Sequence, residues 1–403
     1  MDSSDEEFGF TNSIYRCYFQ MQFEWPCLSF DVLRDDLGSP ESRLRYPHTA
    51  YFVSATQASE DAENQLLVTK ISELNPTKYD DDLDESLLVD PKVKVIGNSH
   101  PSIANRVRSM PQQWNIVATW SQSGSVYIWD IGEAIFASNG DTNQNLETYP
   151  IAECANNGVE GFGLAWSRIN QGILAMGDDN GLINLWSETE TTFTNISSFQ
   201  AYSQSIEDIV FSPQEANVFA CCTVGGYIQL WDTNSLSTPA IQIQAYPDDI
   251  DCNVIDWNPI QKNLLISGSD DGVVKVWDLR NPAQPLVQLP PHHTDSITSI
   301  EWNPHDEAEF ACSSEDGRVT IWDLSVEAFD PGEKEEGIPD QLLFEHSHDD
   351  PKELHYHPQI PSMIAVMGAT FDVFIPDIEG DAGEPALPPE GYVPPEPVPE
   401  TPA

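Results

Sequence analysis

The sequence predicts an all-β fold, a seven-bladed β-propeller in which four-stranded sheets form a closed ring. Three observations predict it. One short block of residues recurs five times, the blocks stand at nearly constant intervals, and short apolar segments separated by turn residues precede each of them. A chain of 403 residues is long enough for one large domain of this kind.

The five blocks share one pattern. They read SGSVYIWD, NGLINLWS, GGYIQLWD, DGVVKVWD and DGRVTIWD, and three of the four intervals between them are 45 or 46 residues. The residues one and three places before each tryptophan are apolar, as in a half-buried strand. This period, with its final Trp-Asp, is typical of WD-repeat propeller blades. The block tryptophans are Trp129, Trp186, Trp231, Trp277 and Trp322.

Two degenerate units bring the number of blades to seven. One begins at His355, contains the same upstream strands and has Phe374 where the other blocks have tryptophan. The other supplies a first blade with strands that begin near Thr49, Asn64 and Pro91. Both units keep the strand pattern of the repeat, so we count them as blades.

A ring of blades has to close, because an open ring leaves unpaired strand edges. The segment 27–35 has the period of a half-buried strand and precedes the first blade, so we expect it to be the outer, closing strand of the last blade. The sequence then divides into an acidic N-terminus with a short helical arm at 1–26, the propeller at 27–378 with an acidic loop insert at 325–342, and a Pro-rich acidic tail at 379–403.

The structural residues of the repeat are only partly retained. Asp271 and Asp316 stand six residues before tryptophan, where they resemble the structural Asp of WD repeats. His293 occupies the usual His position of one blade, whereas Tyr202 and Tyr246 stand there in two others. We therefore expect one blade to keep His, Asp and Trp together.

The formal net charge of −49 arises from 66 acidic residues against 17 basic ones, and no Lys or Arg occurs between 169 and 261. Such a surface repels nucleic acid and anionic membranes and attracts cationic partners. Two explanations remain open. A dedicated basic client would need one acidic face, whereas a high-salt or generally acidic proteome would spread the charge everywhere.

The seven cysteines include no CxxC pair, which predicts reduced and mostly buried thiols in place of disulfides or a zinc module. No run of eighteen apolar residues is present, so we expect no membrane-spanning helix. The N-terminus MDSSDEEFGF lacks the order of a signal peptide. These features predict an intracellular protein.

Several stretches resemble known proteins. EWPCLSF with the preceding SIYRCYFQMQF, HPSIANRVRSMPQQWNIVATW, and the insert between Asp323 and His346 resemble the retinoblastoma-binding histone chaperones. CNVIDW, SGSDDGVVKVWDLR and SIEWNP look closest to the glutamate-rich WD-repeat proteins of that superfamily. The resemblance covers roughly residues 10 to 375. It implies a nucleolar chaperone of a large-subunit ribosomal protein that also binds histones.

Two regions depart from that family. The glutamate-rich tract shrinks here to YDDDLDES, at 79–86, and the Pro-rich tail is not a feature expected of the family. We expect the tail to be extended and solvated.

The resemblance also implies a client-binding groove. In the histone chaperones a basic helix of the client lies between the arm helix and an acidic loop before the last blade. An alternative is that the arm aromatics pack on the propeller and the loop is solvated. The residues expected in the groove are Ile14, Tyr15, Tyr18 and Phe19 from the arm and Glu335, Glu336, Ile338 and Asp340 from the loop.

The end of the fourth of these blocks, VWDLR, fits the motif by which WD proteins dock on the damaged-DNA-binding adaptor of cullin ubiquitin ligases. Asp278 and Arg280 would make the contacts, although an ordinary blade end is the favoured interpretation.

Four histidines suggest a metal site, but no third ligand stands at a defined spacing, so solvated or strand histidines are favoured. There is no GxSxG, HExxH or phosphate-binding glycine loop, and we expect neither enzymatic activity nor a cofactor. The four histidines are His346, His348, His355 and His357.

We therefore predict a non-enzymatic, monomeric chaperone of the nucleus and nucleolus, with some of the protein in the cytoplasm. It would bind a basic large-subunit ribosomal protein during ribosome biogenesis, with histones as further clients, and would contact neither nucleic acid directly nor membranes. The alternatives are a substrate receptor or scaffold of a cullin ubiquitin ligase, which would bind its adaptor, and a histone-binding subunit of a chromatin complex.

Overall fold

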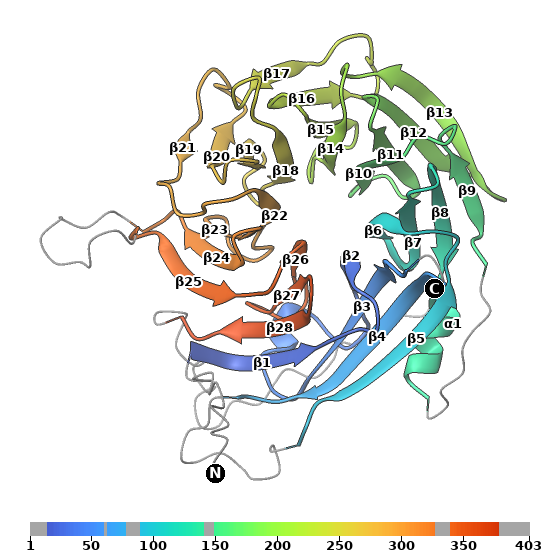
Figure 1. Ribbon diagram of the computed structural model, residues 1–403, viewed down its shortest axis with the longest axis vertical. Coiled ribbons are helices and arrows are strands. Elements are labelled where there is room, and N and C mark those ends of the chain that lie inside the picture. The colour runs from blue at the N-terminus through green and yellow to red at the C-terminus, as the bar shows by residue number, and fades with distance from the viewer. Residues whose placement is uncertain (1–13, 60–62, 78–88, 141–148, 327–338, 379–403) are drawn as a thin grey trace, which may run out of the picture.

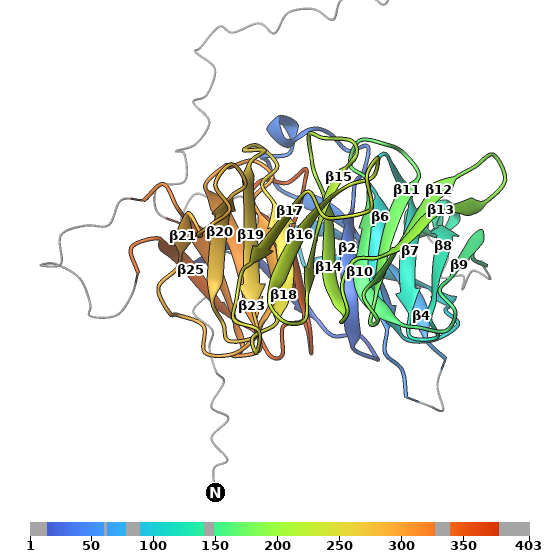
Figure 2. The ribbon, with the colours of Figure 1, turned by 90° about the horizontal axis from the view of Figure 1, so that it is seen from above.

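The computed structural model is a ring of seven four-stranded antiparallel sheets, one per blade (Figure 1). Seen edge-on, the ring is a disc in which the strands run from one flat end to the other (Figure 2). The structure describes residues 14–59, 63–77, 89–140, 149–326 and 339–378. The predicted all-β propeller with seven blades is confirmed.

Each blade runs from an inner strand at the ring axis to an outer strand. Blade 1 contains β2 (Cys27–Leu33), β3 (His48–Thr56), β4 (Gln65–Leu74) and β5 (Lys92–Ser99). Blade 2 contains β6 (Ala104–Met110), β7 (Gln113–Ser121), β8 (Ser125–Asp130) and β9 (Ala152–Ala155). Blade 3 contains β10 (Gly161–Trp166), β11 (Ile173–Asp178), β12 (Leu182–Glu188) and β13 (Phe193–Gln200). Blade 4 contains β14 (Ile206–Phe211), β15 (Val218–Thr223), β16 (Tyr227–Asp232) and β17 (Ile241–Gln244). Blade 5 contains β18 (Cys252–Trp257), β19 (Leu264–Ser269), β20 (Val274–Asp278) and β21 (Val287–Gln288).

Blade 6 contains β22 (Ile297–Trp302), β23 (Glu309–Ser314), β24 (Arg318–Asp323) and β25 (Leu342–Ser347). Blade 7 contains β26 (Glu353–Tyr356), β27 (Ile364–Met367), β28 (Phe371–Pro376) and β1 (Tyr15–Met21). The helical elements in the described part are α1 (Gly132–Ser138) and the short 3-10 helix η2 (Pro40–Ser42). No helix among the described residues is long and apolar enough to cross a membrane. All seven cysteines are buried free thiols, as predicted.

Two predictions about the N-terminal region are wrong. The expected helical arm is the strand β1, and β1, not 27–35, is the outer strand of the last blade, paired antiparallel with β28 (Figure 1). Residues 27–33 form β2, the inner strand of blade 1. The aromatic composition of YRCYFQM suits a strand. Alternation alone marks a strand but not its place in a sheet, which explains the second error.

Carboxylates on inner strands bind neighbouring blades to one another. Each carboxylate accepts the backbone N–H of its following residue and, with its other oxygen, a backbone N–H from the next inner strand. The contacts across blades join Asp31 to Ser109 at 2.6 Å, Asp208 to Ile255 at 3.2 Å and Asp256 to Trp302 at 2.9 Å. Backbone groups at the inner strands are thereby satisfied without a solvent partner.

Blade 6 keeps the complete polar chain that the sequence predicted. Asp316 contacts His293 Nδ1 at 3.1 Å, and His293 Nε2 lies 2.8 Å from Thr320 Oγ1. The Trp322 indole N–H donates to the same Thr320 oxygen at 2.8 Å. The Thr320 hydroxyl therefore links the block tryptophan Trp322 to His293 in the loop before β22, and His293 in turn contacts Asp316 in the turn before β24.

Blade 5 has a substitute for this chain. The Tyr246 hydroxyl lies 2.9 Å from Ser267 Oγ, which also accepts the Trp277 indole N–H at 3.0 Å. Tyr246 thus occupies the place of His, while Asp271 accepts a hydrogen bond from the Ser269 hydroxyl at 2.6 Å.

In blade 2, a histidine that sequence reasoning did not single out has the same role. His100 Nε2 lies 2.8 Å from Thr119 Oγ1, which accepts the Trp129 N–H at 2.9 Å. Among the block tryptophans only Trp186 is part-exposed, and its indole N–H has no hydrogen-bond partner in the structure. The network is therefore retained in some blades and absent from others, as the sequence indicated.

We expect Thr320→Val to lower the free energy of unfolding by about 1–3 kcal/mol, because His293 and Trp322 both lose a buried partner. Urea denaturation followed by tryptophan fluorescence measures the change. Thr294→Val is the control, since Thr294 is exposed and only its backbone N–H contacts Asp316. Equal midpoints for the two variants would contradict this account of the network.

Candidate functional site

Three of the predicted arm residues lie where blade 7 meets blade 6. Tyr15 is 6% exposed, and its ring centroid lies 5.4 Å from that of Phe344 on β25 and 5.7 Å from that of Phe374. Tyr18 stacks on Tyr15 with a centroid distance of 4.9 Å. Ile14 precedes them and is 44% exposed. The buried aromatics thus fix the start of β1 against the neighbouring blade.

Asp372 on β28 is the polar centre of this contact. Its Oδ2 accepts the Tyr18 hydroxyl at 3.1 Å and contacts His346 Nε2 at 3.2 Å. Its Oδ1 accepts from the Gln20 amide at 3.1 Å and the Thr370 hydroxyl at 2.8 Å. One fully buried carboxylate therefore ties β1 to both blade 6 and blade 7.

The electrostatics agree with this geometry. Burial opposes ionisation of Asp372, yet the hydrogen bond from His346 and the charge of His348 hold the pKa of the carboxyl below its usual value. Burial, reinforced by the nearby Asp372 charge, raises the pKa of Tyr15 to about 12. Tyr15 therefore stays neutral, and its hydroxyl lies 2.6 Å from His346 Nδ1.

Around this buried centre lies a partly exposed surface, which we call the rim and define by Ile14, Tyr18, Asp340, Leu343 and Ile378. Leu343, Ile378 and Tyr18 pack on the apolar cluster that contains Tyr15, and Asp340 is part-exposed just before β25. Figure 1 shows β1 and β25 beginning at the same edge of the ring. The rim therefore combines apolar side chains with a carboxylate.

The other predicted groove residues fall elsewhere. Phe19 packs on a different apolar cluster, which contains Phe30 and Phe371 and lies between blades 7 and 1. Glu335, Glu336 and Ile338 lie outside the described residues. The structure thus brings Tyr15 and Tyr18 together against β25, which Asp340 precedes in the chain, and separates Phe19 from them. Tyr15 packs on the propeller, which was the alternative considered for the arm aromatics.

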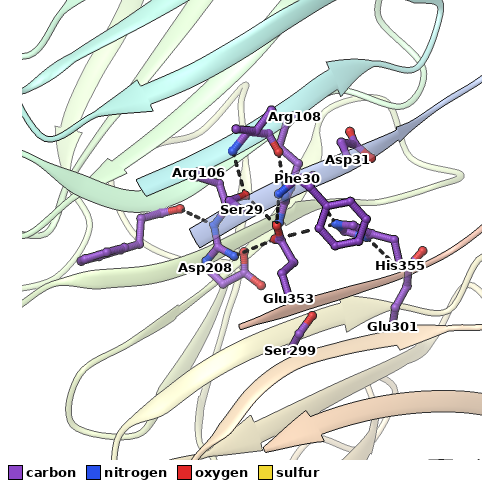
Figure 3. Close-up of polar contacts among 12 residues, drawn as sticks. Ser29, Phe30, Asp31, Arg106, Arg108, Asp208, Ser299, Glu301, Glu353 and His355 are labelled. Atoms are coloured by element: carbon purple, nitrogen blue, oxygen red, sulfur yellow. Dashed lines mark hydrogen bonds and ion pairs between the residues drawn. The ribbon is translucent and has the colours of Figure 1, made fainter. Parts of the chain in front are cut away.

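A second polar centre, which sequence reasoning missed, lies at the ring axis (Figure 3). Glu353 on β26 is 1% exposed and accepts the Ser29 hydroxyl at 2.6 Å and the Phe30 N–H at 2.8 Å. Its second oxygen contacts Arg106 at 3.1 Å and Arg108 at 2.8 Å. Glu353 therefore joins blade 7 to blades 1 and 2.

His355 extends this centre to blade 6. Its Nδ1 lies 2.7 Å from Glu301, and its Nε2 lies 3.1 Å from the Phe30 carbonyl (Figure 3). Burial disfavours the imidazolium, but the charge and hydrogen bond of Glu301 and the contacts with Glu353 raise the pKa of His355 to about 10. Burial likewise opposes ionisation of Glu353, while the Arg108 charge keeps its pKa well below the usual value.

The charged groups in the cavity at the ring axis have partners within it. The cavity, of about 200 Å³, is lined by Arg106, Arg108 and Arg168 together with inner-strand carboxylates such as Asp256. Arg168 contacts Asp256 at 3.3 Å. The side chains that line it therefore hold the inner strands together. The signal in the sequence was the pair of arginines two residues apart in NRVRSM, which places both on one side of a strand.

The remaining predicted sites are separate from both centres. Arg280 is exposed in the turn after β20, where its guanidinium lies 2.6 Å from Asp278. That hydrogen bond lowers the pKa of Asp278 to about 2. The four histidines do not converge, since His346 and His348 adjoin Asp372 while His355 adjoins Glu353. The described residues contain no group of three or more His, Cys, Asp or Glu that could hold a metal ion.

His355 predicts a pH-dependent stability. Its folded-state pKa lies above the ordinary value of 6.5, so its contribution is fully present below pH 6.5 and is lost as the pH rises through about 10. His355→Gln lacks this contribution. We expect the difference in unfolding temperature between wild type and variant to be largest near pH 6 and smallest near pH 10, and a constant difference would contradict the assignment.

Asp372→Ala should loosen β1. It removes the acceptor of Tyr18 and Gln20 and leaves buried partners unpaired, so we expect about 3 kcal/mol of destabilisation. Hydrogen exchange should accelerate in β1 more than in β10, on the far side of the ring. Asp349→Ala, at an exposed loop residue, serves as control. Uniform acceleration across all blades would show that Asp372 has no special role in holding β1.

Comparisons with known proteins agree with the geometry. A family model for the histone-binding protein RBBP4, which also describes a component of the CAF1 complex, matches residues 5–75, which include β1 to β4. A model described as WD domain, G-beta repeat matches residues 243–278 and 283–323, which cover most of blades 5 and 6.

Several curated proteins are similar over long stretches. The chain is 39% identical over 258 residues to Glutamate-rich WD repeat-containing protein 1 of Dictyostelium discoideum, covering 60% of this chain and 53% of that protein. It is 34% identical to Protein HEAT STRESS TOLERANT DWD 1 of Arabidopsis thaliana, covering 92% and 88%, and 33% identical to Ribosome assembly protein rrb1 of Schizosaccharomyces pombe, covering 63% and 55%. The matches thus span about half the length of two relatives and most of the third.

The complete ring, the recurring Trp-Asp blocks, the match of the N-terminal strands and a relative aligned over nine-tenths of the sequence all agree. The chain therefore belongs to the RBBP4-like family of WD-repeat proteins, where it is similar to the glutamate-rich WD-repeat proteins.

Proposed function

We propose that this protein is a non-enzymatic chaperone that binds a basic client at the rim. The observation that carries the proposal is the partly exposed apolar surface beside β1, next to which acidic segments of the chain begin and end. Apolar anchors bordered by carboxylates are the features that hold a basic amphipathic helix. The match to a histone-binding family model over β1 supports the same location.

The neighbouring acidic segments are 1–13, 78–88 and 327–338, each of which contains at least four carboxylates. The described residues beside two of them are bonded to β1 or to the end of β28. The Thr77 N–H donates to the Arg16 carbonyl at 2.9 Å, and Ile14 accepts the N–H of Asp377 at 2.9 Å. Segment 78–88 therefore begins, and segment 1–13 ends, close to the rim, where their charges would raise the local concentration of a cationic client.

The client that we favour is a large-subunit ribosomal protein, held before its assembly into the ribosome. This choice rests on the relative named Ribosome assembly protein rrb1 and on the similarity to the glutamate-rich WD-repeat proteins. Histones are the second class of client, supported by the family model. We therefore also propose a nuclear location, with the nucleolus as the place where the ribosomal protein is bound. Release would occur when RNA competes for the client's cationic surface.

The test is a capture experiment with rim variants. We expect wild-type protein to retain one stoichiometric large-subunit ribosomal protein from extracts of the source cells at moderate salt, as identified by mass spectrometry. The double variant Ile14→Asp and Leu343→Asp should retain at least about tenfold less of this ribosomal protein, because the apolar anchors are removed. The matched control Leu286→Asp changes an exposed residue of blade 5. Capture that the rim variant leaves unchanged would contradict the proposal.

A second candidate function is docking on a cullin ubiquitin-ligase adaptor. The observation that favours it is the exposed guanidinium of Arg280, whose side chain is 71% exposed in the VWDLR turn. Arg280→Ala should abolish binding to purified adaptor and leave capture of the basic client intact. If adaptor binding survives this change, the turn is an ordinary blade end held by the contact with Asp278.

A further inference from the structure

The loop 34–47 between β2 and β3 forms a fixed projection at one flat end of the ring. In Figure 2 its short helix η2 is the blue coil at the top edge. Arg43 and Asp35 pair at 2.8 Å with both side chains nearly buried. The Gln359 amide of blade 7 donates to the carbonyls of Asp35 at 2.8 Å and Gly38 at 3.0 Å. The loop is therefore anchored to both the first and the last blade.

This anchored loop exposes apolar and cationic side chains, and also the carboxylates of Asp36 and Glu41. Leu37 is 56% exposed and Leu44 is 48% exposed, and Arg34 and Arg45 are exposed beside them. Neither guanidinium has an ion-pair partner among the described residues. The whole chain has only 17 basic residues and 66 acidic ones, so two such arginines beside two exposed leucines are unusual on this surface. We call these four residues the loop surface.

The described chain ends close to the loop surface. Asp377 follows β28, is bonded to Ile14 and pairs with Arg16 at 3.1 Å. Tyr46, adjacent to Arg45, packs on the apolar cluster that contains Cys17 of β1 and Ile375 of β28. The 25 residues from 379 to 403 therefore begin beside the loop surface.

The chemistry of this segment complements the loop surface. It contains six carboxylates, no Lys or Arg, eight prolines, and the larger apolar residues Leu387, Tyr392, Val393 and Val398. A Pro-rich chain extends by about 3.1 Å per residue, so Leu387 can reach roughly 28 Å from Ile378. Because prolines restrict the free chain, docking costs less conformational entropy than for an ordinary segment.

We propose that the segment 379–403 docks on the loop surface of its own chain, with its carboxylates at Arg34 and Arg45 and its apolar residues on Leu37 and Leu44. Tethering favours this occupant over a separate acidic molecule, because a short linker gives an effective concentration in the millimolar range. The net charge of −49 repels a free polyanion such as RNA and the acidic segment alike, so tethering is what favours the segment.

The test uses the chain ending at Ile378, the full chain, and a fluorescent peptide of residues 379–403. We expect the shortened chain to bind the peptide saturably in fluorescence anisotropy, and the full chain to bind it at least about tenfold more weakly because its own segment occupies the surface. Arg34→Glu with Arg45→Glu should weaken binding to the shortened chain by about fivefold or more, as should Leu37→Asp with Leu44→Asp.

Arg280→Glu is the matched control, since it reverses the charge of an exposed arginine on blade 5. Circular dichroism checks that each variant is folded. The proposal is overturned if the shortened chain does not bind the peptide at 1 mM (about the tethered concentration), or if the full and shortened chains bind it equally. It is also overturned if a polyglutamate peptide or single-stranded RNA binds as tightly, because the surface would then accept acidic molecules in general.

Discussion

The closure of the ring is the constraint on which the rest of the structure depends. Two contacts provide it. At the outer edge of the ring, β1 pairs with β28, and Asp372 ties β1 to blade 6. At the axis, Glu353 binds β2 and the arginines of β6. Because the first strand belongs to the last blade, the residues that form the rim are positioned only when the whole ring has formed. The proposed client binding would thereby require folding of the complete propeller.

The two contacts differ in energetic character. The β1 contact is largely apolar, with aromatic rings around one carboxylate, and its strength follows buried area. The axial contact consists of charges with very little exposure, which are costly to bury and costly to leave unpaired. Replacing one partner at the axis therefore harms the ring more than replacing an exposed ion pair, and the paired charges specify which inner strands lie side by side.

The sequence predicted the blades well because their signal is local. Each block tryptophan and the apolar residues before it repeat at short range, and blade 6 has the predicted His293, Asp316 and Trp322 network. The position of a strand within its sheet depends on pairing with distant parts of the chain, so the positions of β1 and β2 were predicted wrongly. The axial centre also escaped prediction, because Arg106 and Glu353 are 247 residues apart and no periodicity relates them.

The acidic charge is not confined to the rim. Exposed carboxylates such as Asp248, Asp270 and Asp349 lie in loops of blades 4 to 7, at the end of the ring opposite η2. A general negative charge speeds the encounter with any cationic protein, whereas position and selectivity require specific contacts. In the proposed function the rim supplies those contacts through Ile14 and Leu343, so charge and shape have separate roles in client recognition.

The most direct test of client binding at the rim is a hydrogen-exchange map of the native complex with its captured client. This account predicts added protection in peptides that cover residues 14–18 and 342–344, with the inner strands unchanged. Protection centred on the loops of blades 4 and 5, with none at β1, would contradict it and would place the client elsewhere on the propeller.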